Sequence, residues 1–397
     1  MSNGMHIRTF TQIRVDGRCR PGDGELPGQG TPITAMASNC GHRLRLEDIS
    51  HRFGDLVAVR DIYLDIAGGE LVALLGPSGC GKSTLLRIVS GFIRQSSGRV
   101  LFDGEVVDHL PPSRRGAGIV FQNYALFPHM TVAENVAYGL EAHKWPRQRI
   151  GPRVAEMLSL VHMSEFATRK PRQLSGGQQQ RAALARCLAT DPKVLLLDEP
   201  FGALDKNLRL DMQIEVKRLQ REYGITTILV THDQEEALSM ADRIAVMARG
   251  SIEQVSSPTE IYDEPMTLFV NQFVGTANVV AGEFMGADNG VAIVRVPGGA
   301  MLTAKETPQL VAGAPVLVSV RPEQLRLEAA PGEGRIAGVV KAVMPLGPHV
   351  IYEVETQGGT SLKVSEPRDA ATPLRRPGES VHVTAASEAA CRVFPKA

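Results

Sequence analysis

A glycine-rich stretch after residue 75 has the residue types and spacing to bind phosphate. Gly76-Pro-Ser-Gly-Cys-Gly-Lys82-Ser83 fits the pattern G-x-x-x-x-G-K followed by Ser or Thr, and it comes after the apolar run Glu70–Gly76. Glycines let the backbone curl so that its N–H groups point at a phosphate, and a helix N-terminus adds its dipole. The lysine supplies charge to the β- and γ-phosphates, and the hydroxyl can bind Mg²⁺. A plain glycine turn is the alternative, and the strand-loop-helix context argues against it.

Two adjacent carboxylates follow a second apolar run. Asp198 and Glu199 stand at the end of KVLLLDEP, residues 193–200. Ligands of parallel sheets collect at the carboxyl ends of the strands, so we expect this pair beside the glycine-rich loop. Neighbouring strand residues point to opposite sides, so Asp198 could hold Mg²⁺ through water while Glu199 polarises an attacking water. Two solvated acids at a strand end are the alternative.

Short apolar runs alternate with helical patterns between residues 44 and 275. Besides the two runs above, ITTILVTHD at 225–233 and RIAVM at 243–247 are typical of buried strands. Continuous apolar runs between helices indicate parallel strands that are covered on both faces. These patterns predict an α/β fold with a parallel-sheet core.

A helical insertion is expected at about 123–190. Thr131 and Glu134 have the spacing of a capping box. Apolar residues then recur at i, i+3, i+4 and i+7, first at Ala133, Val136, Ala137 and Leu140, and again at Val154, Met157, Leu158 and Val161. This spacing gives each helix one apolar face.

The two ends of the chain differ from its middle. Residues 1–43 include PGDGELPGQGTP and show no apolar periodicity, which predicts a disordered extension. Residues 276–397 contain short strand-like segments separated by Gly and Pro, which predict one or more small β barrels. The expected domains are therefore an extension at 1–43, an α/β domain at 44–275 and a β-rich domain at 276–397.

Composition excludes several classes of protein. Lys and Arg number 43 and Asp and Glu number 43, so the net charge of zero argues against a general nucleic-acid binder. No apolar stretch approaches the roughly 18 residues of a membrane span. The five cysteines are scattered without a CxxC pair, which argues against a disulfide framework. We expect a soluble multidomain protein.

A second glycine-containing motif links these features to a family. Leu174-Ser-Gly-Gly-Gln178 precedes the strand that bears Asp198. With that order and spacing, the chain resembles the ATP-hydrolysing subunit of an ABC transporter. Ser175 can cap the following helix, and glycines let a phosphate approach bare N–H groups. The resemblance implies a homodimer in which each ATP lies between residues 76–84 of one subunit and residues 175–178 of the other.

The resemblance covers residues 44–275 strongly and implies roles for further residues. Phe53 stands where an aromatic ring stacks on adenine, although Tyr is commoner there and a core Phe is the alternative. Gln122 matches a loop glutamine that reaches Mg²⁺ and the attacking water, and His232 matches a histidine that contacts the γ-phosphate. The implied catalytic residues are Glu199, His232, Gln122 and Lys82, and the implied Mg²⁺ ligands are Ser83, Gln122 and Asp198. The implied ATP-binding residues are Phe53, Gly76, Pro77, Ser78, Gly79, Cys80, Gly81, Lys82, Ser83, Thr84, Ser175, Gly176, Gly177, Gln178 and Asp205, the last in a loop that crosses the dimer interface.

The C-terminal part shows a weaker resemblance. SVRPEQLRL at 319–327 and GTANVV at 275–280 resemble the transport-associated, oligonucleotide-fold-like barrel domain of bacterial import ATPases. In that family the domain supports dimerisation and regulation. A packing extension without a regulatory role is the alternative.

Four functions were compared. The first is an import ATPase that converts ATP and water to ADP and phosphate and docks on separate membrane permease subunits. The docking site is expected near residues 122–127, with exposed Tyr124 and Phe127 as anchors. Packing of these two rings in the core is the alternative. The others are a soluble ABC ATPase acting on nucleic acid or ribosomes, an exporter subunit, and a non-catalytic interaction protein. A single ATPase unit, a β-rich C-terminal domain and intact motifs favour the importer.

The transported solute is inferred from two segments. ALSMADRIAVM and SIEQVSSPTEIYDEP, at 237–247 and 251–265, resemble the polyamine, 2-aminoethylphosphonate and ferric-iron importers. Spermidine/putrescine is the first expectation, with 2-aminoethylphosphonate or ferric iron as alternatives. The resemblance also implies a peripheral location on the cytoplasmic face of the bacterial inner membrane and an indirect periplasmic partner, a solute-binding protein.

Overall fold

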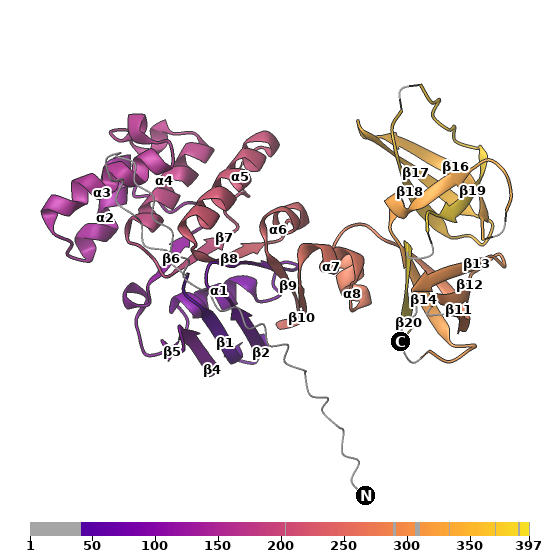
Figure 1. Cartoon of the computed structure of the whole chain (residues 1–397), viewed down its shortest axis with the longest axis horizontal. Helices are drawn as coiled ribbons and strands as arrows, with labels where there is room; N and C mark the ends of the chain where they lie inside the picture. Colours follow the sequence, from indigo (N-terminus) through magenta and orange to yellow (C-terminus); the bar gives the residue numbers. More distant parts are fainter. Residues whose placement is uncertain are drawn as a thin grey trace, which may run out of the picture. The chain divides into compact units, whose positions relative to one another are not determined.

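The computed structural model describes residues 41–202, 204–288, 291–305, 310–332, 334–369, 371–387 and 390–396 (Figure 1). The expected disordered extension at 1–43 falls almost entirely outside these residues. No helix of the described part is long and apolar enough to cross a membrane.

A six-stranded sheet in the order β10-β9-β3-β8-β7-β6 lies at the centre of the α/β part. Five of its strands run parallel: β3 (Leu71–Leu75), β6 (Ala117–Val120), β7 (Val194–Asp198), β8 (Thr226–Thr231) and β9 (Arg243–Ala248). β10 (Ser251–Ser256) pairs antiparallel at one edge. The predicted parallel core is therefore confirmed.

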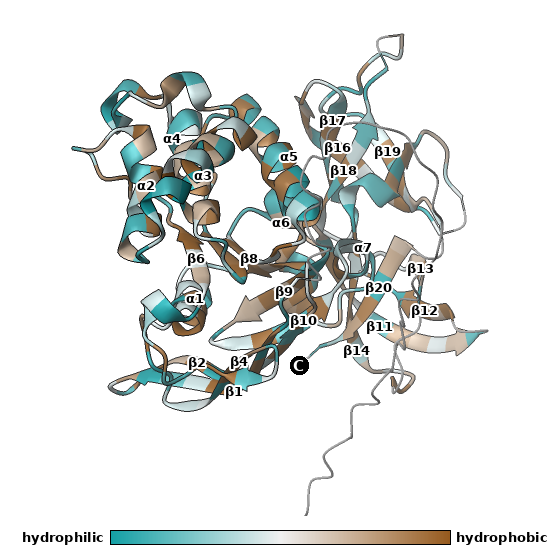
Figure 2. Cartoon of the chain, turned by 60° about the vertical axis from the view of Figure 1, so that its left-hand side comes forward, coloured by the Kyte–Doolittle hydropathy of each residue, from teal (hydrophilic) through white to brown (hydrophobic). Residues whose placement is uncertain are grey.

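Both faces of this sheet are buried. Along β3, Leu71 and Ala73 belong to one hydrophobic core, while Val72 and Leu74 belong to another. The first core is shared with α4 (Gly176–Ala189) and α5 (Lys206–Tyr223), and the second with α1 (Lys82–Ser90). Brown, hydrophobic residues accordingly dominate several of the central strands (Figure 2). This double burial explains why these strands are continuous apolar runs.

A second, antiparallel sheet closes the core around α1. Its order is β2-β1-β4-β5, built from β1 (Leu44–Phe53), β2 (Leu56–Ile66), β4 (Ser97–Phe102) and β5 (Glu105–Val106). Leu46, Ile62 and Val100 from this sheet pack with Leu85 of α1.

The helical insertion is present as α2 (Val132–Ala142), α3 (Arg147–Leu160) and α4 (Gly176–Ala189). The predicted capping box is confirmed, because the Thr131 hydroxyl accepts from the Glu134 amide at 3.2 Å and the Glu134 carboxylate accepts from the Thr131 amide at 2.6 Å. Of the predicted apolar faces, Ala133 and Ala137 are partly buried and the other residues are buried, with Val136 and Met157 fully inaccessible.

Four further helices follow the insertion: α5 (Lys206–Tyr223), α6 (Gln234–Met240), α7 (Pro258–Asp263) and α8 (Leu268–Phe273). α5 begins at the N-cap Asp205 and ends at Gly224, whose φ of 59° is a left-handed conformation that suits glycine. α5 follows the loop after β7, and α6 follows the loop after β8.

The remaining residues form two β structures around one hydrophobic core. A closed barrel contains β11 (Asn278–Asp288), β12 (Val291–Arg295), β13 (Met301–Lys305), β14 (Pro315–Val320) and β20 (Cys391–Pro395). A five-stranded sheet contains β15 (Leu325–Glu328), β19 (Ser380–Ala385), β16 (Ile336–Pro345), β17 (His349–Thr356) and β18 (Ser361–Pro367). The all-β fold class is confirmed, with a sheet beside the expected barrel.

Candidate active site

The glycine-rich loop joins β3 to α1, as its sequence predicts. Gly81 is the N-cap of α1 with a φ of 108°, and a methyl group built on it would lie 2.5 Å from the Ala58 carbonyl oxygen. Gly79 also has a positive φ, of 81°, but faces open space. The loop therefore needs glycine at 81 for both conformation and space, and at 79 for conformation alone. Pro77 and Ser78 are exposed at its crest.

Lys82 lies across the inside of this loop. Its Nζ donates to the carbonyl oxygens of Gly76 at 2.7 Å and Pro77 at 3.0 Å, and the side chain is buried. Cys80 is buried as well, with its Sγ 3.9 Å from that Nζ. A methyl group on Gly76 would lie 2.7 Å from the sulfur, so Cys80 packs inside the loop as a small filler.

Ser83 and Asp198 come together at the start of α1 and the end of β7. The Ser83 hydroxyl donates to Asp198 Oδ1 at 3.3 Å. Burial raises the pKa of Asp198 above its usual range, so a nearby cation would stabilise its ionised form. A hydroxyl and a carboxylate are hard oxygen donors of the kind that Mg²⁺ prefers, with waters and phosphate oxygens completing the shell. Thr84 is half-buried one residue further along α1.

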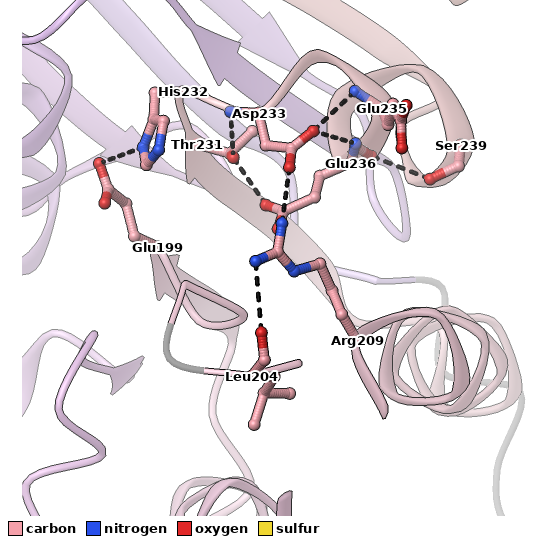
Figure 3. Close-up of polar contacts among 9 residues, drawn as sticks. All are labelled: Glu199, Leu204, Arg209, Thr231, His232, Asp233, Glu235, Glu236 and Ser239. Atoms are coloured by element: carbon pink, nitrogen blue, oxygen red, sulfur yellow. Dashed lines mark hydrogen bonds and ion pairs between the residues drawn. The ribbon is translucent and has the colours of Figure 1, made fainter. Parts of the chain in front are cut away.

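The side chains of Glu199 and His232 are in contact at the carboxyl edge of the sheet. Glu199 Oε1 lies 3.1 Å from His232 Nδ1 (Figure 3). The pair forms because β7 and β8 are neighbours, with Asp198 paired to Val230. The expectation that Asp198 and Glu199 are neighbouring strand residues with side chains on opposite sides is wrong. Strand β7 ends at Asp198, and Glu199 has a left-handed φ of 47°. Such a backbone at a residue with a side chain stores strain of about 1–3 kcal/mol.

Gln122 and Phe53 are both accessible. A methyl group on Gly202 would lie 3.7 Å from Gln122 Nε2 and 3.7 Å from the Glu199 carbonyl oxygen, so the amide lies beside the Glu199 turn. Phe53 is 50% exposed at the end of β1 and makes an edge contact with His51. The core interpretation of Phe53 is therefore wrong, and its ring is free to stack on a base.

The residues 175–178 form the start of α4. The Ser175 hydroxyl accepts from the Gln178 amide at 3.4 Å, and Gln178 Oε1 accepts from the Ser175 amide at 2.9 Å, so the predicted cap is present. A methyl group on Gly176 would lie 3.3 Å from Leu204, and one on Gly177 would lie 2.9 Å from Leu208. The two glycines therefore also allow α4 to pack closely on the start of α5.

Asp205 acts as a cap within its own chain. Its carboxylate accepts from the Leu208 amide at 3.0 Å, while Asp205 itself is exposed. The structure thus groups Lys82, Ser83, Asp198, Glu199, His232 and Gln122 around one sheet edge. The hydrogen bonds described above for residues 175–178 and for Asp205 instead run to their own helices, α4 and α5.

The expectation that Tyr124 is an exposed anchor is wrong. Tyr124 is only 5% exposed and belongs to the main core, because its backbone turns inward at a φ of 60°. Burial raises the pKa of its phenol. Phe127 is half-buried, and its ring centroid lies 4.6 Å from that of Tyr138, which is 45% exposed. Arg186 of α4 holds this loop by donating to the carbonyl oxygens of Tyr124 and Ala125.

Ionic contacts lie behind His232 that the sequence motifs do not predict. Asp233 caps α6 and accepts from Arg209 at 2.8 Å, and Glu236 is buried beneath them. Asp followed by Gln-Glu-Glu is a helix N-terminus signal that could have identified the cap. Nothing local to either segment indicates Arg209 as the partner.

Comparisons with known proteins agree with this geometry. The family model described as "ABC transporter" matches residues 59–202, and the "TOBE domain" model matches residues 318–394. The chain is 46% identical over 344 residues to spermidine/putrescine import ATP-binding protein PotA of Pseudomonas fluorescens strain Pf0-1, covering 86% of this chain and 95% of that protein. It is 50% identical over 329 residues to the protein of that name from Thermobifida fusca, covering 81% and 85%.

A solved structure with a similar fold is cbiO1 from Clostridium perfringens, part of the ABC transporter complex cbiONQ. The TM-score is 0.52 and the identity 33%, over 56% of this chain and 92% of that one.

Proposed function

Since the chain belongs to the ATP-binding subunits of ABC transporters, we propose that it powers the import of spermidine and putrescine through separate membrane permease subunits. The chain is an ATPase that uses Mg²⁺. The observation that supports catalysis is the grouping of a buried lysine, a hydroxyl–carboxylate pair and a glutamate–histidine pair at one sheet edge. The names of the relatives support the choice of solute.

We assign substrate binding to the loop at 76–84. Its amides and the Lys82 ammonium bind the phosphates, and Phe53 stacks on the adenine, since the hairpin of β1 and β2 places Ala58 against Gly81. Ser83 and Asp198 would hold Mg²⁺, with Gln122 as a further ligand. When bound, the ion neutralises phosphate charge as a Lewis acid.

Hydrolysis requires a water aligned with the γ-phosphorus. The Glu199 carboxylate accepts a hydrogen bond from this water and receives its proton as the oxygen–phosphorus bond forms and the bond to the bridging oxygen breaks. His232, held against Glu199 at 3.1 Å, donates toward the γ-phosphate. Both side chains retain solvent access, His232 more than Glu199, which leaves room for substrate between them and the loop.

A complete site requires a second copy of the chain. Ser175 is exposed at the start of α4, a helix of 14 residues whose first two residues have no side chain. The N–H groups at such a helix terminus can donate hydrogen bonds to a phosphate. In the described residues, this terminus is not hydrogen-bonded to the phosphate-binding loop of its own chain. We place it over the ATP of the partner subunit, with Asp205 at the interface, in a two-fold homodimer.

The permease contact is proposed at Phe127 and Tyr138. Their adjoining rings form an accessible aromatic surface on the loop that starts at Gln122, so movement at the γ-phosphate could reach the membrane subunits through this loop. The chain would then be a peripheral protein of the cytoplasmic face of the inner membrane, and the solute-binding protein in the periplasm would be an indirect partner.

The solute is tested by uptake in cells that lack the chromosomal gene. Radiolabelled spermidine and putrescine uptake should fall and return with the wild-type gene, but not with a gene encoding Glu199→Gln. Uptake of 2-aminoethylphosphonate and ferric iron should stay unchanged. Loss of either of these uptakes, with polyamine uptake intact, would reassign the solute.

A further inference from the structure

The first turn of α5 places a cation behind the catalytic histidine. Arg209 lies four residues after Asp205, and its amide donates to the Asp205 carbonyl at 2.9 Å. Its side chain is 31% exposed and points toward the loop after β8 rather than into solvent (Figure 3). Arg209 therefore belongs to the loop region of Asp205 by sequence and contacts the loop region of His232 in space.

The guanidinium joins three groups from two loops. Nη1 donates to Asp233 Oδ2 at 2.8 Å and lies 4.0 Å from Glu236 Oε1. Nη2 donates to the Leu204 carbonyl at 3.4 Å. Because the guanidinium is planar and its donors are fixed in a fork, these contacts constrain the two loops relative to each other.

The two residues that flank His232 are both fixed by this cluster. The Thr231 hydroxyl donates to Glu236 Oε2 at 2.6 Å and accepts from the Asp233 amide at 2.9 Å. Asp233 Oδ1 accepts from the amides of Glu235 and Glu236 at 2.9 Å and 3.3 Å. The backbone on each side of His232 therefore cannot move without breaking these bonds.

The buried carboxylate of Glu236 requires the positive charge of Arg209 nearby. It is only 3% exposed, and burial raises its pKa, with the Asp233 charge adding to the shift and the Arg209 charge opposing it. Without Arg209, two neighbouring carboxylates would share a poorly solvated space. One would take up a proton or move outward, and either change would alter the hydrogen bonds that fix the turn.

We propose that Arg209 is a positioning residue that couples the loop of Asp205 to His232, so that the histidine adopts its catalytic position only when both loops are in place. This inference rests on the proposed roles of Glu199 and His232. Within the part of the chain that the structure describes, the side-chain polar contacts of Arg209 run to Asp233, Glu236 and Leu204 and not to the residues assigned to the phosphates. Its loss should therefore lower kcat and leave ATP affinity unchanged.

The test uses the full chain with three substitutions. Arg209→Met removes the charge at similar length. Arg209→Lys keeps the charge but cannot pair with Asp233 and the Leu204 carbonyl together. Arg218→Met is the matched control, because Arg218 lies on the same helix and pairs with Glu215 and Glu222 at the surface. Phosphate release against ATP concentration gives kcat and KM, fluorescent ATP without Mg²⁺ gives affinity, and circular dichroism gives thermal stability.

Misplacement of a catalytic group by about 1 Å can cost roughly 100-fold, so we expect Arg209→Met to lower kcat about 10- to 100-fold at an unchanged KM. Arg209→Lys should fold like the wild type with an intermediate kcat, and Arg218→Met should match the wild type. An Arg209→Met kcat equal to that of Arg218→Met overturns the proposal, as does a raised KM at normal kcat. If Arg209→Met does not fold, a wild-type kcat in Arg209→Lys overturns it and a reduced kcat supports it.

Failure of the proposed function is recognised separately. Turnover by the wild type and its loss in Glu199→Gln test the proposed catalytic role of Glu199 independently of Arg209. The positioning role is overturned when these two controls behave as expected and Arg209→Met does not.

Discussion

Substitution of Glu199 by glutamine separates ATP binding from hydrolysis. The change replaces one carboxylate oxygen by an amide nitrogen and alters the volume little, and the amide oxygen can still face His232 Nδ1, now 3.1 Å from the carboxylate. The left-handed backbone at this position suits glutamine as it suits glutamate. What is lost is the carboxylate that we propose as the base for the attacking water.

The size of the effect follows from this single loss. Removing a positioned general base costs about 10²–10⁴ in rate, which corresponds to roughly 3–5 kcal/mol in the activation free energy. The contacts of Lys82 with the loop carbonyls and the Ser83–Asp198 pair do not involve Glu199, so ATP affinity should be unchanged. ATP should then hold the variant in its closed dimer.

Steady-state phosphate release and gel filtration with and without Mg-ATP measure these two properties. Glu235→Gln is the matched control, because Glu235 is exposed on α6 and lies outside the Glu199–His232 pair. We expect turnover to be abolished only in Glu199→Gln, with a dimer peak that persists in ATP. Near-normal turnover in that variant would refute the assignment of Glu199 as the base.

Three further predictions address the dimer, the metal and the β-rich part. A purified heterodimer of Lys82→Ala and Ser175→Arg subunits should retain one composite site and measurable ATPase activity, whereas both homodimers should be inactive. Acidification should raise the Mg²⁺ concentration for half-maximal phosphate release, because burial raises the pKa of Asp198 and lets protons compete with the cation at a higher pH than they would for an exposed aspartate. Arg321→Met should lower the melting temperature in calorimetry, because the buried guanidinium donates to three backbone carbonyls, while exposed Arg326→Met should not.

The parallel sheet was predictable because burial of a strand on both faces leaves an apolar pattern within the sequence of that strand. Strands β3 and β8 are buried at every residue, so β3 is apolar throughout and β8 has an apolar centre, residues 228–230, between threonines. The antiparallel sheet gave a weaker signal, since β1 alternates in burial and its pairing with β2 shifts register at three places. The closure of the barrel by β20 had no local signal, because β20 pairs with strands more than 70 residues away in sequence.

The phosphate loop and the helix caps were predictable because their chemistry lies within a few consecutive residues. The positive φ of Gly81 and the capping hydroxyl of Ser175 require particular residue types at fixed offsets. Exposure is different, because it depends on what packs nearby. Tyr124 and Phe127 lie three residues apart in one loop, yet the backbone at 124 turns its ring into the core while Phe127 stays near the surface.

The relation between the two catalytic loops is set outside the motifs. The motifs contain the residues that we propose to bind ATP, but the distance from Glu199 to His232 depends on how the loops after β7 and β8 are held. Arg209 and Asp233, which are 24 residues apart in sequence, connect these loops. The local sequence of neither segment predicts this contact. We therefore expect that a chain can keep every motif residue and still lose hydrolysis rate through a change at Arg209. For this reason, the rate of hydrolysis has to be measured in variants of the residues behind the site as well as in variants of the motifs.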